Sequence, residues 1–126
     1  MSLAPAASAK PAPPAVTAPG PLVGSLYVHV PFCARKCDYC AFYSERASAT
    51  LIERYLGALE RELAMFAPRL APRTIFFGGG TPSLLGTAHW ERIHDLFDRF
   101  GWSHAAEWTI ESNPATVTLD KAMLWR

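Results

Sequence analysis

The chain has 126 residues, half of them hydrophobic, which suits about one small domain with a packed core. Its formal net charge is only +1 and it carries no basic stripe, which argues against nucleic acid as the main partner. No apolar run approaches the roughly 20 residues of a transmembrane helix, so we expect no membrane span.

Residues 1–24 consist mostly of alanine and proline, and we expect them to form a disordered tail, because proline blocks helices and little here can be buried. Lys10 is their only cation and prolines interrupt any apolar stretch, so the segment does not fit a signal peptide. Ordered structure is expected over residues 25–126. It begins with a strand at Leu26–Val30, a β-rich run that Pro31 closes.

The next elements are a helix over residues 50–67 and a strand at Thr74–Phe77. A capping box of Thr50 and Glu53 is expected to start the helix, and Pro68 and Pro72 to end it. The strand is a continuous apolar run, as expected where both faces are covered. The helix is predicted from apolar side chains that share one face: Ile52, Tyr55, Leu56, Leu59, Leu63 and Phe66.

A second helix is predicted at Thr87–Phe100, with Gly101 as its stop, and a third strand at Trp108–Ile110. Thr118 is expected to cap a third helix. This alternation of strands and helices predicts an α/β fold of parallel strands with crossover helices. A three-stranded parallel sheet leaves an open apolar edge, so we expect the chain to be a fragment of a longer protein or a truncated product.

The most informative motif is the cysteine run Cys33, Cys37 and Cys40, spaced C-x3-C-x2-C. Three thiolates can hold one [4Fe-4S] cluster and leave its fourth iron open to a small molecule. Two alternatives remain: structural zinc, with His29 as a fourth ligand, and buried cysteines without a ligand. An odd number of closely spaced cysteines does not suit a secreted disulfide framework, which favours the cytoplasm.

Two further motifs follow the other predicted strands. Three glycines, residues 78–80, allow close approach of a ligand to the backbone, or a tight turn before a helix. Glu111 ends the third strand, either as a ligand contact or as a solvated charge. Tyr27 and His29 share a face of the first strand. In a parallel β/α barrel, the carboxyl ends of the strands build the active site, so all three motifs are expected at one edge.

The strings LYVHVPFCARKCDYCAFYS, TIFFGGGTPSLL and TIESNPATVTLDK resemble the radical S-adenosylmethionine (SAM) superfamily. Within it they resemble the oxygen-independent coproporphyrinogen III oxidases and the related HemW heme chaperones. The resemblance covers residues 25–126 and implies the N-terminal portion of a partial, TIM-like (β/α) barrel, the radical SAM core domain.

The resemblance also implies roles for individual residues. Cys33, Cys37 and Cys40 match the ligands of the [4Fe-4S] cluster. The positions that contact the SAM on the open iron match Tyr27, Gly79 and Glu111, and those that line the neighbouring pocket match Tyr39, Gly80 and Thr81. No catalytic side chain is assigned.

One departure separates the two branches of this family. The oxidases resemble C-x3-C-x2-C-x-C, whereas Phe42 occupies the position of the fourth cysteine here. This favours a heme chaperone that binds heme and passes it to acceptor proteins. The alternatives are a coproporphyrinogen III oxidase, an oxidoreductase that acts on a porphyrinogen, and a non-enzymatic zinc-binding module.

Overall fold

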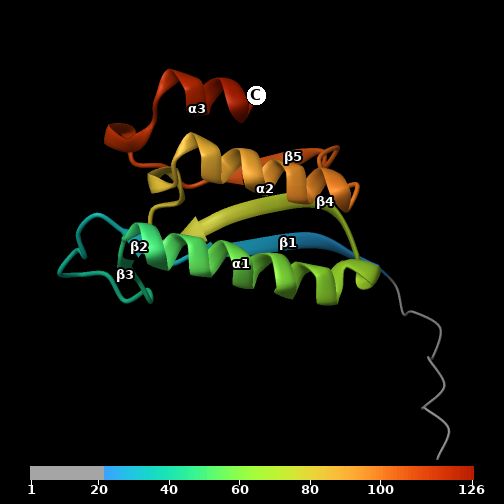
Figure 1. Ribbon diagram of the computed structural model, residues 1–126, viewed down its shortest axis with the longest axis horizontal. Helices are drawn as coiled ribbons and strands as arrows, with labels where there is room; N and C mark the ends of the chain where they lie inside the picture. Colours follow the sequence, from blue (N-terminus) through green and yellow to red (C-terminus); the bar gives the residue numbers. More distant parts are fainter. Residues whose placement is uncertain (1–21) are drawn as a thin grey trace, which may run out of the picture.

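The computed structural model describes residues 22–126, so the disordered tail predicted for residues 1–24 lies outside the described part over residues 1–21. The prediction is wrong for residues 23 and 24, which belong to the first strand. Three parallel strands form one sheet in the order β1-β4-β5 (Figure 1). Their bounds are Val23–Val30 for β1, Leu70–Gly79 for β4 and Glu107–Ile110 for β5. This confirms the predicted α/β fold with parallel strands and crossover helices.

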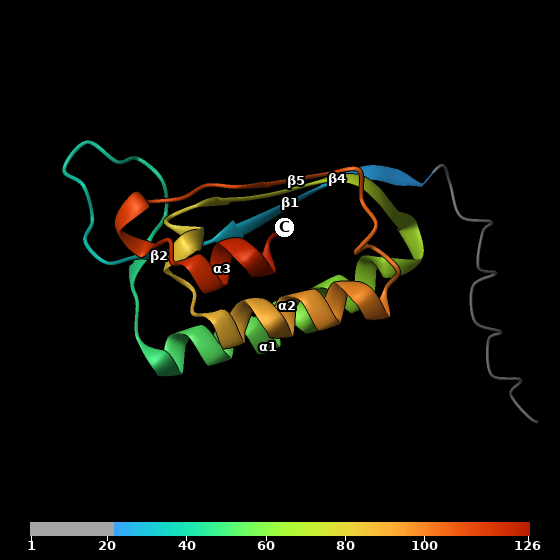
Figure 2. The same ribbon diagram turned by 90° about the horizontal axis from the view of Figure 1, so that it is seen from above.

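Two long helices, α1 (Ala49–Phe66) and α2 (Thr87–Arg99), cover the same face of the sheet (Figure 2). A short helix, α3 (Leu119–Leu124), packs beside α2. As predicted, Thr118 caps α3, because its side chain accepts a hydrogen bond from the amide of Lys121 at 3.3 Å. None of the helices within residues 22–126 combines the length and apolar character that crossing a bilayer requires.

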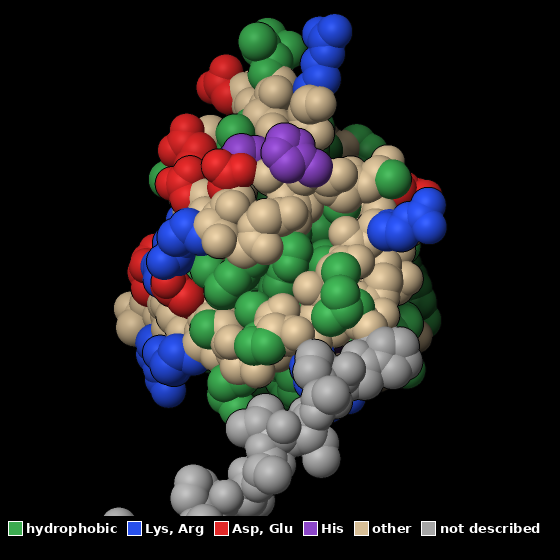
Figure 3. Space-filling model, turned by 90° about the vertical axis from the view of Figure 1, so that its right-hand side faces the viewer, with side chains coloured by type: hydrophobic (Ala, Val, Ile, Leu, Met, Phe, Trp, Pro, Cys, Tyr) green, Lys and Arg blue, Asp and Glu red, His purple; other side chains and the backbone are tan. Residues whose placement is uncertain are grey.

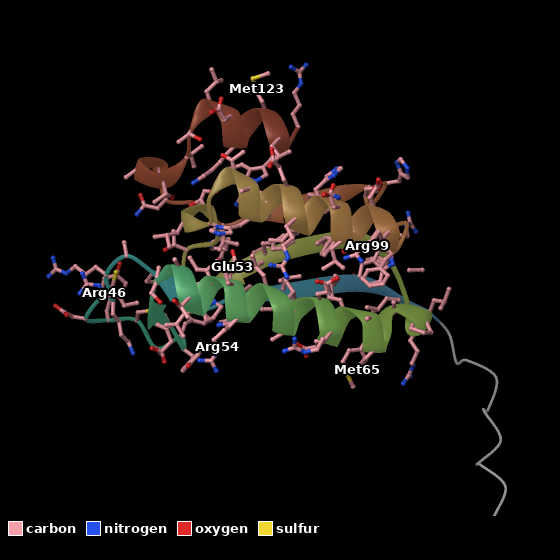
Figure 4. All side chains as sticks on the ribbon, viewed as in Figure 1. Arg46, Glu53, Arg54, Met65, Arg99 and Met123 are labelled. Atoms are coloured by element: carbon pink, nitrogen blue, oxygen red, sulfur yellow. The ribbon has the colours of Figure 1, made fainter. Side chains whose placement is uncertain are left out.

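The start of α1 differs from the predicted capping box. The N-cap is Ser48, whose side chain accepts from the amide of Leu51 at 3.3 Å, so the Thr50 and Glu53 prediction is wrong. Glu53 instead points between the helices and accepts from Arg92 of α2 at 3.0 Å (Figure 4). The carboxylate therefore joins two helices rather than capping one.

Pro72 does not end α1, because it lies within β4. Pro68 lies in the 3₁₀ turn Ala67–Arg69 that follows α1. Proline cannot donate to a sheet ladder, but Pro72 sits where the register shifts, between the pairs Val23–Leu70 and Ser25–Thr74. Because Pro72 has no partner in β1 at this irregularity, its lack of an N–H group removes no hydrogen bond of the sheet.

The core lies between the sheet and the helices. Side chains of the strands that face the helices are almost completely buried, including Val30 and Phe77 at 0% exposure. On the opposite face, Phe76 is 36% exposed and stacks on Tyr27 with ring centroids 5.7 Å apart. The prediction that Thr74–Phe77 is covered on both faces is therefore wrong for residues 22–126, because α1 and α2 lie on one side only.

Hydrophobic side chains also reach the surface at the end of the molecule where β1 and β4 begin. Figure 3 looks onto this end and shows them across the middle of the face. Val23 and Leu26 of β1 line a hollow of about 520 Å³ together with Phe66 and Leu70. The hollow follows β1 as far as Tyr27 and His29, whose side chains are described with the site below.

Candidate metal centre

The three sequence motifs meet at one edge of the sheet. The cysteine loop follows β1, the glycines end β4 and Glu111 follows β5. The loop is closed at its base by a short parallel pair between β2 (Phe32–Cys33) and β3 (Glu45–Arg46). The amide of Glu45 donates to the carbonyl of Pro31 at 2.6 Å. The base of the loop is thus held by its own backbone.

All three cysteines are free thiols, and their side chains line a single cavity of about 560 Å³. Cys33 and Cys40 are half-buried and Cys37 is exposed. A turn connects the last two, since the amide of Cys40 donates to the carbonyl of Cys37 at 3.0 Å. Within residues 22–126, no three His, Cys, Asp or Glu side chains converge as ligands of one metal ion. What the arrangement provides is three soft donors that face a common space.

The end of β4 runs very close to the base of the cysteine loop. The amides of Gly80 and Thr81 donate to the carbonyls of Val30 and Phe32 at 2.8 and 2.7 Å. A Cβ atom on Gly80 would lie 2.5 Å from the carbonyl oxygen of Phe32, so only glycine allows this approach. The hydroxyl of Thr81 lies 3.8 Å from the sulfur of Cys33.

Gly79 joins β1, β4 and the residue after β5. Its φ is +108°, which glycine adopts readily and other residues rarely do. A Cβ atom here would lie 2.5 Å from the ring of His29. The amide of Gly79 donates to a carboxylate oxygen of Glu111 at 3.1 Å. The carboxylate is exposed, so the alternative of a solvated charge is right about its surroundings, but it also has a specific backbone partner.

His29 links the first strand to the cysteine loop. Its Nε2 lies 3.2 Å from the carbonyl of Tyr43, and its Nδ1 lies 3.4 Å from the hydroxyl of Tyr27. The hydroxyl of Tyr55, from α1, donates to the carbonyl of His29 at 2.8 Å. Tyr27 and His29 therefore share a face as predicted. Sequence reasoning assigned Tyr55 to the core and gave no role to Tyr43.

Seven of the nine predicted site residues line the cavity: Cys33, Cys37, Tyr39, Cys40, Gly79, Gly80 and Thr81. Tyr39 is 90% exposed, and a side-chain hydrogen bond with Cys37 raises the pKa of its phenol. The other two lie outside the lining: Glu111 reaches it through the amide of Gly79, and Tyr27 lies on the open face of the sheet.

Comparison with known proteins identifies the family. The model of the radical SAM superfamily matches residues 27–125. The chain belongs to the radical SAM superfamily.

Its curated relatives include both branches that the sequence motifs resemble. The chain is 38% identical to the heme chaperone HemW of Escherichia coli over 103 residues, which cover 77% of the chain and 27% of that protein. It is 37% identical to the oxygen-independent coproporphyrinogen III oxidase of Salmonella typhimurium over 101 residues, which cover 76% of the chain and 22% of the oxidase. The chain thus spans about a quarter of the length of these relatives.

A solved structure gives the same family from the fold. Coproporphyrinogen III oxidase (HemN) from Escherichia coli, described as a radical SAM enzyme, matches with a TM-score of 0.67 and 30% identity. The match covers 86% of this chain and 26% of the oxidase chain. The three strands and their helices are therefore part of a radical SAM fold.

The residues of the site suit the cofactors that this superfamily implies, a [4Fe-4S] cluster and SAM. Thiolates are the ligands of iron–sulfur clusters, and three of them face one space. The same cavity continues to Gly79, Thr81 and Asn113, which offer backbone and polar groups to a small molecule.

Proposed function

We propose that Cys33, Cys37 and Cys40 bind a [4Fe-4S] cluster and that SAM binds beside it, within the cytoplasmic heme chaperone branch of the superfamily. Residues 25–126 are proposed to form the N-terminal portion of the radical SAM core domain. The observation that carries the proposal is the single cavity that joins the cysteine loop to the ends of β4 and β5.

Each part of the site has a physical task in this proposal. When bound, a reduced [4Fe-4S] cluster would supply the electron for reductive cleavage of SAM, and the protein would supply binding and orientation. The glycines at positions 79 and 80 keep the wall free of side chains, so a ligand can reach the backbone. Glu111 places a carboxylate, an acceptor for amine or hydroxyl donors, next to that wall.

The heme chaperone branch is favoured by Phe42. It stands two residues after Cys40, where the oxidase pattern has a fourth cysteine, and its side chain is 64% exposed. Heme is then the cargo of the whole protein, which passes it to acceptor proteins. The oxidase alternative keeps support from the 37% identity to the Salmonella enzyme, and a porphyrinogen would be its substrate.

Anaerobic iron–sulfur reconstitution followed by electron paramagnetic resonance (EPR) of the reduced protein, with and without SAM, tests the proposal. We expect a [4Fe-4S] signal that shifts when SAM is added. Cys37→Ser should lose the cluster because it removes one of three ligands, whereas Ala41→Ser, a matched change in the same loop, should retain it.

Other outcomes are equally informative. An EPR signal of the cluster that does not change when SAM is added contradicts the SAM site. Protein that contains zinc and no iron contradicts the cluster and supports the zinc-binding module. The two heme-related branches are separated by heme titration and by an assay for coproporphyrinogen III consumption. Consumption of the porphyrinogen would contradict the chaperone assignment.

A further inference from the structure

A lysine is buried outside the cavity, in the third helix. Lys121 is 8% exposed, and burial lowers the pKa of its amino group. Its Nζ donates to two backbone carbonyls, those of Ser83 and Thr116, each at 2.8 Å. Lysines are rarely buried, and burying this one is tolerable because two of its three donors are paired with backbone carbonyls.

The two carbonyls belong to the two segments that follow β4 and β5. Ser83 lies in the 3₁₀ turn Pro82–Leu84, directly after the glycines, and Thr116 lies in the 3₁₀ turn Pro114–Thr116, after Glu111. Lys121 therefore connects two segments that are more than 30 residues apart in the sequence.

The hydroxyl of Ser83 strengthens the same connection. Ser83 is completely buried, and its Oγ accepts from the amide of Asn113 at 2.9 Å. The same oxygen lies 2.6 Å from the hydroxyl of Thr116. The two segments are thus joined by the lysine and by direct bonds between them, of which the bond from Lys121 to the carbonyl of Ser83 is buried and the others are partly buried.

Both segments form part of the wall of the cavity that the cysteines face. Thr81 and Leu84 line it from the side of β4, and Asn113 and Thr116 line it from the side of β5. Lys121 does not line the cavity, but the atoms that it contacts belong to these wall segments. Displacing either segment changes the width of the space between the cysteine loop and the end of β5.

We propose that Lys121 is a positioning residue, which holds the segments after β4 and β5 in the relative position that SAM binding requires. This inference rests on the proposed function, because it takes SAM as the ligand of the cavity. It also implies that Lys121 affects SAM binding much more than cluster assembly, since the cysteine loop is closed by its own β2–β3 pair.

The test replaces Lys121 with methionine, which keeps most of the length of the side chain and removes the amino donors. Met123→Ala, an exposed position on the same helix, is the control. Amide hydrogen exchange without SAM should become faster in residues 78–85 and 112–118 of Lys121→Met, and remain unchanged in α1. Iron content should be retained, and the affinity for SAM, from equilibrium dialysis, should fall at least tenfold.

Three results are decisive. Unchanged exchange in both segments, or faster exchange with unchanged SAM affinity, overturns the positioning role. Loss of iron together with SAM binding also overturns it, since that pattern indicates general unfolding. If Lys121→Met does not fold, Lys121→Gln, which keeps a neutral donor, is measured by the same criteria. Failure of the unmodified protein to bind SAM contradicts the proposed function, and the exchange measurement then decides the role of Lys121 separately.

Discussion

Replacing Gly79 with alanine tests the packing at the junction of the three strands. Gly79 has a φ of +108°, a value that residues other than glycine rarely adopt. The new Cβ would lie 2.5 Å from the ring of His29. Backbone strain of this kind costs about 1–3 kcal/mol. Overpacking against a fixed ring adds about 1–3 kcal/mol, so we expect Gly79→Ala to lower the free energy of unfolding by about 2–6 kcal/mol.

Other glycines separate the two contributions. Gly101 also has a positive φ, +73°, but nothing lies within 4 Å of the position of its Cβ, so Gly101→Ala should cost only the backbone term, about 1–2 kcal/mol. Gly24 also has open space around it and no positive φ, so Gly24→Ala should be nearly neutral or slightly stabilising. Urea denaturation followed by circular dichroism gives the free energy of unfolding for each variant.

A double-mutant cycle with His29→Ala isolates the steric term. If the ring of His29 is the obstacle, Gly79→Ala should cost about 1–3 kcal/mol less in the His29→Ala background than in the unmodified chain. Equal costs in the two backgrounds, or a Gly79→Ala variant no less stable than Gly101→Ala, would refute the close packing of Gly79 on His29.

Two further predictions concern the helices. Tyr55→Phe leaves the carbonyl of His29 without its side-chain donor and should lower the free energy of unfolding by about 1–2 kcal/mol, measured by urea denaturation; an unchanged midpoint contradicts the role of this bond. Hydrogen bonds and charge from Arg99 and Arg92 lower the pKa of Glu60 below its ordinary value of 4.5. The stabilisation that the Glu60 carboxylate gives the folded chain is therefore fully present well above pH 4.5, and it is lost as the pH falls through the lowered pKa. Glu60→Gln should be less stable than the unmodified chain at neutral pH and equally stable in strong acid, and a difference independent of pH would contradict this.

Local sequence patterns predicted the main elements of the fold correctly. The apolar period placed the first helix at residues 50–67, and it spans Ala49–Phe66. The second helix was expected at Thr87–Phe100 and spans Thr87–Arg99. A helix with one buried face records that face in its own sequence, so its position requires no knowledge of the partner. The parallel order of the strands followed from the alternation of elements.

The predictions that failed depend on partners far away in the sequence. Ser48 and Thr50 are both good N-cap residues, and the local sequence favours Thr50 because of the carboxylate of Glu53, but Arg92 of the other helix binds that carboxylate. The apolar run that contains Phe76 has the same sequence whether one or two layers cover it. Pro72 is compatible with a strand only because of a local shift in register.

The residues of the candidate site also divide into those that the local sequence indicates and those that depend on distant segments. The spacing of the cysteines and the glycine run indicated five residues that line the cavity, because cysteine and glycine at such spacing are uncommon outside special backbone or ligand roles, and the family resemblance added Tyr39 and Thr81. Ser83 and Lys121 carry no such signal, since serine and lysine are ordinarily surface residues. Their burial follows from the meeting of two segments that are distant in the sequence.

The arrangement also predicts that Lys121 and Ser83 act on the wall of the site rather than on the cysteine loop. The cysteine loop has bonds of its own, from Glu45 to Pro31 and from Ala47 to Cys33, and the amide of Thr81 also donates to the carbonyl of Phe32 at its base. The opposite wall is fastened by Lys121 and Ser83, which make none of those bonds. A change in the wall should therefore alter the affinity for a small molecule and leave the binding of a cluster intact, whereas a change at a cysteine should abolish both, because the cluster is proposed to supply the open iron that holds the small molecule.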